Sequence, residues 1–166
     1  MSTIITTKDR PSREPAVYRG SPWQALGWFG AIVTVIGLGQ LALYFYPAMA
    51  FGSPEWEFGA SAQLLGALPL PTIGLAALFA AGAGSGSRRG MMALAIILVL
   101  MAVAVFGVLV LFATVVPMAL QATPGNLREP IYQAMGRSVL SGVGFGFLYL
   151  WAAWLAVRQM KRPTER

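Results

Sequence analysis

Residues 91–116 read MMALAIILVLMAVAVFGVLVLFATVV, without one charged side chain and with Thr114 as the only polar one. As a helix this stretch would be ~39 Å long at ~1.5 Å per residue, enough to cross the ~30 Å hydrocarbon layer of a bilayer. Inside that layer a chain must satisfy its backbone hydrogen bonds internally, and a helix does so. The stretch therefore predicts a membrane-spanning helix.

Three more apolar runs flank this one, and 57% of the 166 residues are hydrophobic while only 11% are charged. This composition departs from that of soluble domains. We predict an all-α protein of four transmembrane helices joined by short loops. The predicted spans are residues 23–46, 60–82, 91–116 and 138–157. They form one membrane domain, residues 21–160, between a polar tail at residues 1–20 and a basic tail at residues 161–166.

The second predicted span contains two prolines, Pro69 and Pro71. Counted from Pro71 alone, the apolar stretch that follows is too short to cross the hydrocarbon layer, so the span must include residues before the prolines. Each proline removes an amide donor, which frees the carbonyls of Leu65 and Ala67 and bends the helix. We therefore expect the second helix to be kinked.

The basic residues are distributed unevenly over the two sides of the predicted bundle. Ten of the 12 Lys and Arg residues fall in the polar tail, in the turn at residues 82–90 and in the C-terminal segment from Arg158 on, and only Arg128 and Arg137 fall on the other side. Positive residues in short flanking segments stay in the cytoplasm. We therefore expect both termini to be cytoplasmic, in a bacterial inner membrane. The net charge of +6 is explained by these flanks, so no nucleic-acid partner is expected.

The loop between the third and fourth spans carries apolar residues at a spacing of four, namely Leu127, Ile131 and Met135. This spacing is typical of one apolar face of a helix. With Pro130 near its start, it predicts a separate short helix lying on the membrane surface.

The chain contains no Cys and no His. It therefore has neither the usual zinc and haem ligands nor the side chain most used for proton transfer near neutral pH. We expect no covalent cofactor, no cofactor ligated by His or Cys and no metal site, while a bound lipid, or surface contact with a pigment or quinone, is compatible with the sequence. Because no nucleophile–base pair is visible either, we expect a protein that is not an enzyme.

Glu55 and Glu57 follow Ser53 and Pro54, a pair typical of a helix start. Two carboxylates on the outer side could act as acid and base or hold a cation. Their spacing of two points them to different sides of a helix, however, and acids are stabilising in a first turn for electrostatic reasons alone. We favour the structural interpretation, with either acid paired to Arg128 or Arg137 as a clamp between the two helical hairpins.

Gln40 and Gln63 are the most polar side chains near membrane depth, each in the outer half of its span. They could line a small-molecule or quinone pocket, but such residues more often join helices through interhelical hydrogen bonds, and we favour that role. The spans contain no ionisable group of the kind that active transporters carry.

Ser138, Gly142 and Gly146 repeat at a spacing of four along the fourth span. Small residues at this spacing let two helices approach closely. The stripe predicts either packing inside the bundle, which is the default, or association with another membrane protein.

The segment PEWEF at residues 54–58, followed by LPLPTIGLA at residues 68–76, resembles the membrane domain of HpsJ-like proteins. That family is linked to polysaccharide secretion and filament behaviour in cyanobacteria. The resemblance implies a membrane domain and brings no catalytic residues.

These features favour a non-catalytic integral membrane subunit with a structural or accessory role in a larger inner-membrane complex, such as a photosynthetic or respiratory one. Its expected partners are the bilayer and other membrane proteins. The alternative is a small transporter or channel formed by homo-oligomerisation, in which Gln40, Gln63 and the kinked second span would line the pathway.

Overall fold

The structure is a computed structural model, and it describes residues 21–44, 46, 53–122, 124–125 and 128–160. Across these residues it is helical and contains no strand. The helices are α1 (Pro22–Leu43), α2 (Pro54–Ala67), α3 (Pro69–Ser85), α4 (Arg88–Ala122) and α5 (Arg128–Met160). Since α2 and α3 follow each other directly, they form one spanning helix, and four helices are long and apolar enough to cross a membrane. The prediction of an all-α, four-span protein is confirmed.

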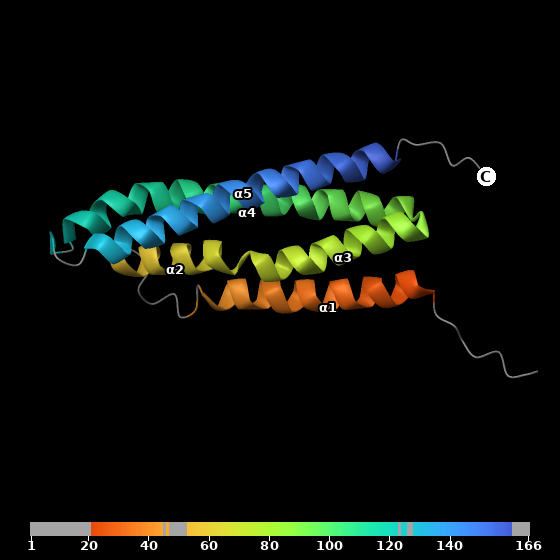
Figure 1. Cartoon of the computed structure of the whole chain (residues 1–166), viewed down its shortest axis with the longest axis horizontal. Helices are drawn as coiled ribbons and strands as arrows, with labels where there is room; N and C mark the ends of the chain where they lie inside the picture. Colours follow the sequence, from red (N-terminus) through yellow and green to blue (C-terminus); the bar gives the residue numbers. More distant parts are fainter. Residues whose placement is uncertain (1–20, 45, 47–52, 123, 126–127, 161–166) are drawn as a thin grey trace, which may run out of the picture.

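The helices lie side by side along one long axis, with α1 packed mainly on α3 and with α4 and α5 packed on each other (Figure 1). The start of α1, the turn from α3 to α4 and the end of α5 lie together at one end of the bundle, which we name the Arg88 end. The start of α2 and the start of α5 lie at the opposite end, which we name the Arg128 end. Four crossings therefore return the described chain to the end at which it starts.

The second spanning helix is kinked, as predicted, and the kink measures 35°. It lies where α2 ends at Ala67 and α3 begins at Pro69, with Leu68 between them. Neither proline can donate a backbone hydrogen bond, so the helical ladder is interrupted here. It resumes at Thr72, whose amide donates to the carbonyl of Leu68 at 3.2 Å.

The kink gives the two halves of the second helix different neighbours. On the C-terminal side of the kink, α3 packs along α1. On the N-terminal side, α2 packs against α4 and α5 and barely contacts α1. Between α2 and α4, the rings of Phe58 and Phe112 stack with their centroids 5.2 Å apart. The main neighbours of the second helix therefore change at the bend, from α4 and α5 to α1.

Two helices are longer than their predicted spans. The 35 residues of α4 and the 33 of α5 correspond to ~50 Å each, against a hydrocarbon layer of ~30 Å. The excess lies at the Arg128 end, where both helices extend past the end of α1 (Figure 1). Pro117 lies inside α4, which continues to Ala122.

The prediction of a separate surface helix is wrong. Ile131 and Met135 belong to the first turns of α5, which runs without interruption from Arg128 into the fourth span, and Leu127 lies outside the described residues. Pro130 is tolerated because it falls in the first turn, where amides have no partner within the helix. Spacing alone could not distinguish a surface helix from an extension of the next span.

Candidate functional site

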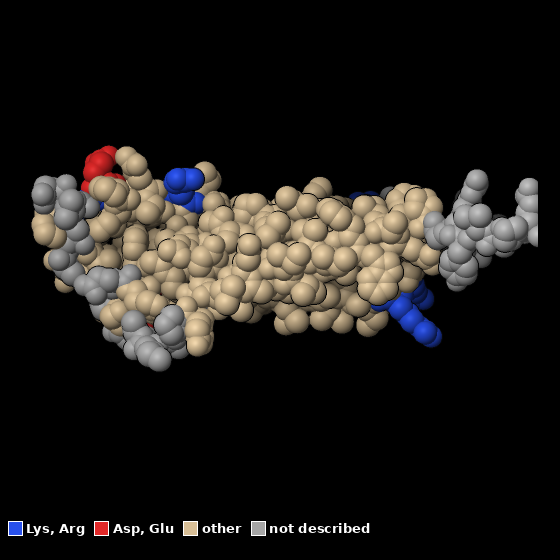
Figure 2. Space-filling view, turned by 90° about the horizontal axis from the view of Figure 1, so that it is seen from below, with Lys and Arg blue, Asp and Glu red and all other residues tan. Residues whose placement is uncertain are grey.

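Charged side chains of the described chain gather at the two ends of the bundle, as Figure 2 shows for one face. Arg88 and Arg89 are exposed at one end, while Arg128, Glu129 and Arg137 are exposed at the other. The helical segments between the two ends contain no charged residue. Any site in the spanning part of the bundle must therefore work with neutral groups.

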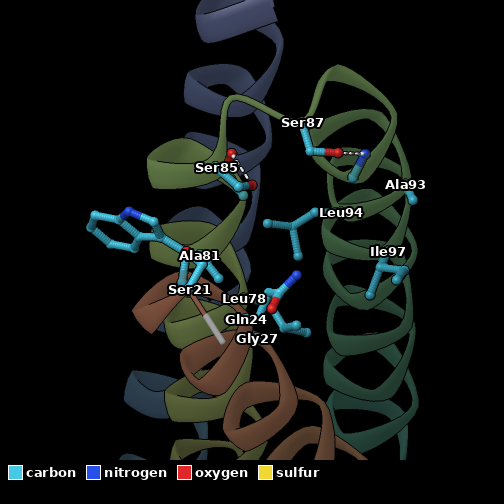
Figure 3. Close-up of a pocket in the computed structure, with 13 residues that line it drawn as sticks. Ser21, Gln24, Gly27, Leu78, Ala81, Ser85, Ser87, Ala93, Leu94 and Ile97 are labelled. Carbon is cyan, nitrogen blue, oxygen red and sulfur yellow. Dashed lines mark hydrogen bonds between the residues drawn. The ribbon is translucent and has the colours of Figure 1, made fainter. Parts of the chain in front are cut away.

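A hollow of about 550 Å³ opens at the Arg88 end between α1, α3 and α4 (Figure 3). It exists because α1 packs on α3 and hardly contacts α4, which leaves a gap between α1 and α4 with α3 as its floor. The polar residues of its wall are Ser21, Gln24, Ser85 and Ser87; the apolar ones include Leu78, Ala81, Leu94 and Ile97.

Two of the polar residues, Ser85 and Ser87, lie at the mouth of the hollow, and Gln24 lies deeper, beside Leu78 (Figure 3). The Ser85 hydroxyl donates to the Gly82 carbonyl at 3.3 Å, and the Ser87 hydroxyl accepts the amide of Gly90 at 3.2 Å. Each of these serine oxygens keeps further hydrogen-bonding capacity. The side chain of Gln24 extends from α1 into the space between α1 and α4, and its amide has no hydrogen bond to the described part of the chain (Figure 3).

Three close contacts fix the position of α1 beside this hollow. Gly84, in the last turn of α3, lies directly against the ring of Trp23, and a methyl group there would collide with it. Further along, a Cβ atom on Gly30 would lie 2.8 Å from the carbonyl oxygen of Gly74, and one on Gly37 would lie 2.7 Å from the nitrogen of Pro71. The gap between α1 and α4 is therefore set by rigid backbone contacts between α1 and α3.

A second polar feature lies deep in the bundle, between α3 and α5. The hydroxyl oxygens of Thr72 and Tyr149 are 2.6 Å apart, and the Thr72 hydroxyl donates to the Leu68 carbonyl at 2.7 Å. Since the Thr72 proton is used on Leu68, Tyr149 is the donor to Thr72. Tyr149 is 1% exposed. This chain of hydrogen bonds ties α5 to the turn that follows the kink.

A hollow of about 210 Å³ lies beside this pair, and its other wall residues are apolar. Because both hydroxyls are engaged with each other, we read the pair as a structural contact rather than as a catalytic or binding group.

The predicted small-residue stripe lies inside the bundle. Ser138, Gly142 and Gly146 are all buried in α5. A Cβ atom on Gly142 would lie 2.8 Å from the side chain of Leu109, and one on Gly146 would lie 2.8 Å from the ring of Phe106, both on α4. In the described chain, then, the stripe packs α5 against α4.

The two glutamines singled out from the sequence do not lie in the bundle core. Gln40 on α1 and Gln63 on α2 are both exposed, and neither side chain has a hydrogen bond to another described residue. Their predicted role in joining helices of one chain stays a prediction, and the structure places them where a second molecule could reach them.

The predicted charge clamp concerns the Arg128 end. The packing of α2 on α5 brings Glu57 to the same end of the bundle as Arg128 and Arg137, and the side chain of Glu55 lies outside the described part. At the start of α2, the amide of Glu57 donates to the Ser53 carbonyl at 3.0 Å, but the Ser53 hydroxyl forms no capping bond. The clamp itself stays a prediction.

Sequence reasoning missed the residues that make the closest helix contacts. On α1, the buried residues Gly30, Thr34, Gly37 and Leu41 follow one helical stripe. The spacing of Gly30 and Thr34 was a readable signal, since it is the same small-residue pattern found in α5. For Thr72 and Tyr149 no local signal existed, because they are 77 residues apart.

Comparison of the chain with family models, with curated proteins and with solved structures finds no match.

Proposed function

We propose that the protein is a non-catalytic membrane subunit that packs against other membrane proteins in a bacterial inner-membrane complex, with both termini in the cytoplasm. The observation that carries this proposal is that the buried polar side chains form hydrogen bonds within the bundle. In the described part of the chain no buried side-chain nitrogen or oxygen lacks a hydrogen-bond partner. A reaction site or a solute path usually needs polar groups held ready for a substrate, and here those groups serve packing.

The outer faces of the spanning helices support the same proposal. On α1, Trp28 and Val35 are 73% and 69% exposed, and on α5, Leu140 is 76% exposed. Such faces are stable only against lipid or against other apolar helices. They offer broad, uncharged surfaces to neighbouring membrane proteins.

Gentle purification tests this role. The tagged chain would be extracted from its native membrane in a mild detergent, and co-purifying proteins would be identified and quantified. We expect one or more membrane proteins in a fixed ratio to the chain. Val35→Trp and Leu140→Trp add bulk to the exposed faces of α1 and α5. If a partner packs on one of these faces, the variant on that face should no longer co-purify with the partner, while the yield of the chain itself stays unchanged. A monomer that brings no partner with it would contradict the proposal.

A channel formed between copies of the chain is the alternative, and the exposure of Gln40 and Gln63 favours it. Polar side chains on the outside of a bundle could line a path only between molecules. Ion or solute flux into liposomes should then require Gln63 and be lost in Gln63→Leu. The matched control is Gln133→Leu, an exposed glutamine near the start of α5. Equal flux in both variants would exclude this path.

A further inference from the structure

The hollow at the Arg88 end has a mostly apolar interior, and two basic residues are next to its wall in the chain. Two exposed arginines, Arg88 and Arg89, lie between the wall residues Ser87 and Gly90 in the chain. Deeper in, the wall is made of aliphatic side chains such as Leu78 and Leu94. A ligand that fits must be negatively charged at one end and apolar along the rest.

The hollow is deep enough to reach about two thirds of the way through the hydrocarbon of one leaflet. Along α4 its wall runs from Gly90 to Ile97, ~10 Å at ~1.5 Å per residue, and one leaflet contributes about half of a ~30 Å hydrocarbon layer. Further along α1 and α4, a separate hollow of about 260 Å³ has an apolar wall that includes Leu41, Leu64 and Val105. An extended hydrocarbon chain could lie along the gap between α1 and α4.

The neutral polar groups of the wall suit a phosphate ester. Gln24 can donate from its amide, and the Ser87 hydroxyl, which accepts from Gly90, still has its own proton to donate. Together with the two guanidinium groups, they provide donors and no carboxylate, since the described wall contains no Asp or Glu. This donor set favours an anion over a zwitterion.

We propose that this hollow binds one anionic glycerophospholipid from the leaflet at the Arg88 end. Its phosphate lies at Arg88 and Arg89 beside Ser87, and one acyl chain lies in the gap between α1 and α4. The position of α1 is fixed by its contacts with α3, so the site is formed before the lipid enters. Each arginine near a membrane surface contributes roughly fivefold to the binding of an anionic lipid.

Trp23 lines the hollow and provides a local reporter of the bound lipid. A variant with Trp23 as its only tryptophan, the other four replaced by Phe, would be reconstituted into vesicles of phosphatidylcholine and phosphatidylglycerol. In separate samples, one or the other lipid carries bromine on its acyl chains and quenches nearby tryptophan. We expect phosphatidylglycerol to quench Trp23 well beyond its share of the vesicle. A second reporter variant keeps only Trp151, 59% exposed on α5, and should show no such preference.

Two pairs of variants test the site itself. Arg88→Gln with Arg89→Gln should reduce the preference at Trp23 by roughly 25-fold, about fivefold for each arginine. Arg137→Gln with Arg158→Gln removes the same charge elsewhere and should leave the preference unchanged.

Ala93→Phe fills the hollow and should lower quenching by phosphatidylglycerol, whereas Val103→Phe, on an exposed part of α4, should not. Equal effects within either pair would overturn the proposal, because they would indicate general attraction to the surface.

Other occupants give different results. If glycerol phosphate added to the buffer abolishes the quenching by phosphatidylglycerol, the site binds a free phosphate ester and the proposed lipid is wrong. If the variant with four replacements does not fold, native mass spectrometry of the natural sequence from the same vesicles decides the question. One tightly held phosphatidylglycerol, lost in Arg88→Gln with Arg89→Gln, is expected, and retention of that lipid would overturn the proposal.

Discussion

The hydroxyl groups of Thr72 and Tyr149 meet at 2.6 Å although 77 residues separate them in the chain. Tyr149 donates to Thr72, and Thr72 donates to the Leu68 carbonyl next to the kink. A polar bridge at this place joins α5 to the second helix where the proline break weakens that helix. The contact thus stabilises both the bend in the second helix and the packing of α5 against that helix.

Tyr149→Phe should therefore destabilise the bundle. It removes only the hydroxyl group and keeps the buried ring, so the loss should be about 0.6 kcal/mol and at most ~2 kcal/mol, the usual range for hydrogen bonds between spanning helices. Unfolding in detergent, followed by circular dichroism, measures the difference. Tyr132→Phe, at an exposed tyrosine of α5, is the matched control and should have no effect. Equal stability of the two variants would show that the bridge contributes nothing.

The contact between α1 and α3 should be equally sensitive to one added methyl group. A Cβ atom on Gly74 would lie 2.8 Å from the backbone oxygen of Gly30, which cannot move aside without shifting α1. Gly74→Ala should cost about 1–3 kcal/mol, as overpacking does elsewhere. Gly39→Ala is the control, since nothing lies within 4 Å of that position, and it should be neutral or slightly stabilising. The same unfolding assay compares them, and a neutral Gly74→Ala would contradict the close approach.

Much of this fold could be predicted from the sequence. Long uncharged runs predicted the four spans, because charged side chains are costly in hydrocarbon, and Pro69 and Pro71 predicted the kink, because proline has no amide donor. The buried side of α4 could not be predicted. In a run as uniformly apolar as residues 91–116, lipid and protein core select the same side chains, so periodicity carries no information about which side is buried.

Tyr149 illustrates a second limit. It lies close to Trp151 and Trp154, which are exposed on α5, and Arg158 lies 5.2 Å from the ring of Trp154. The sequence places all three aromatic rings together near the basic end, yet one of them points into the bundle. Tyr149 lies three residues after Gly146 and so continues the buried stripe of α5, but no local pattern reveals that Thr72 is its partner.

The charge clamp at the Arg128 end predicts a rescue. Glu57→Arg and Arg128→Glu should each lower stability slightly, by up to about 1 kcal/mol for a pair near the surface, and the double variant should recover it. A double-mutant cycle in the unfolding assay measures the coupling. Arg137→Glu, combined with Glu57→Arg, tests the other candidate partner. If neither double variant is more stable than its single variants, α2 and α5 are not joined by charge.

The orientation in the membrane can be measured cleanly because the chain has no cysteine. Ser87→Cys places one thiol at the Arg88 end, and Gln133→Cys places one near the Arg128 end. A maleimide that cannot cross membranes should reach Gln133→Cys in intact spheroplasts and Ser87→Cys only after lysis, because arginine-rich flanks stay in the cytoplasm. The reverse pattern would invert the proposed topology.

The 35° kink also has a mechanical consequence. The second helix packs on α1 mainly through α3 and on the α4–α5 pair mainly through α2, so it connects two parts that otherwise hardly meet. Straightening it would swing α1 relative to the α4–α5 pair and so widen or narrow the gap at the Arg88 end. Bilayer thickness sets how far a bent helix must reach, so a change in thickness would change the width of the gap between α1 and α4.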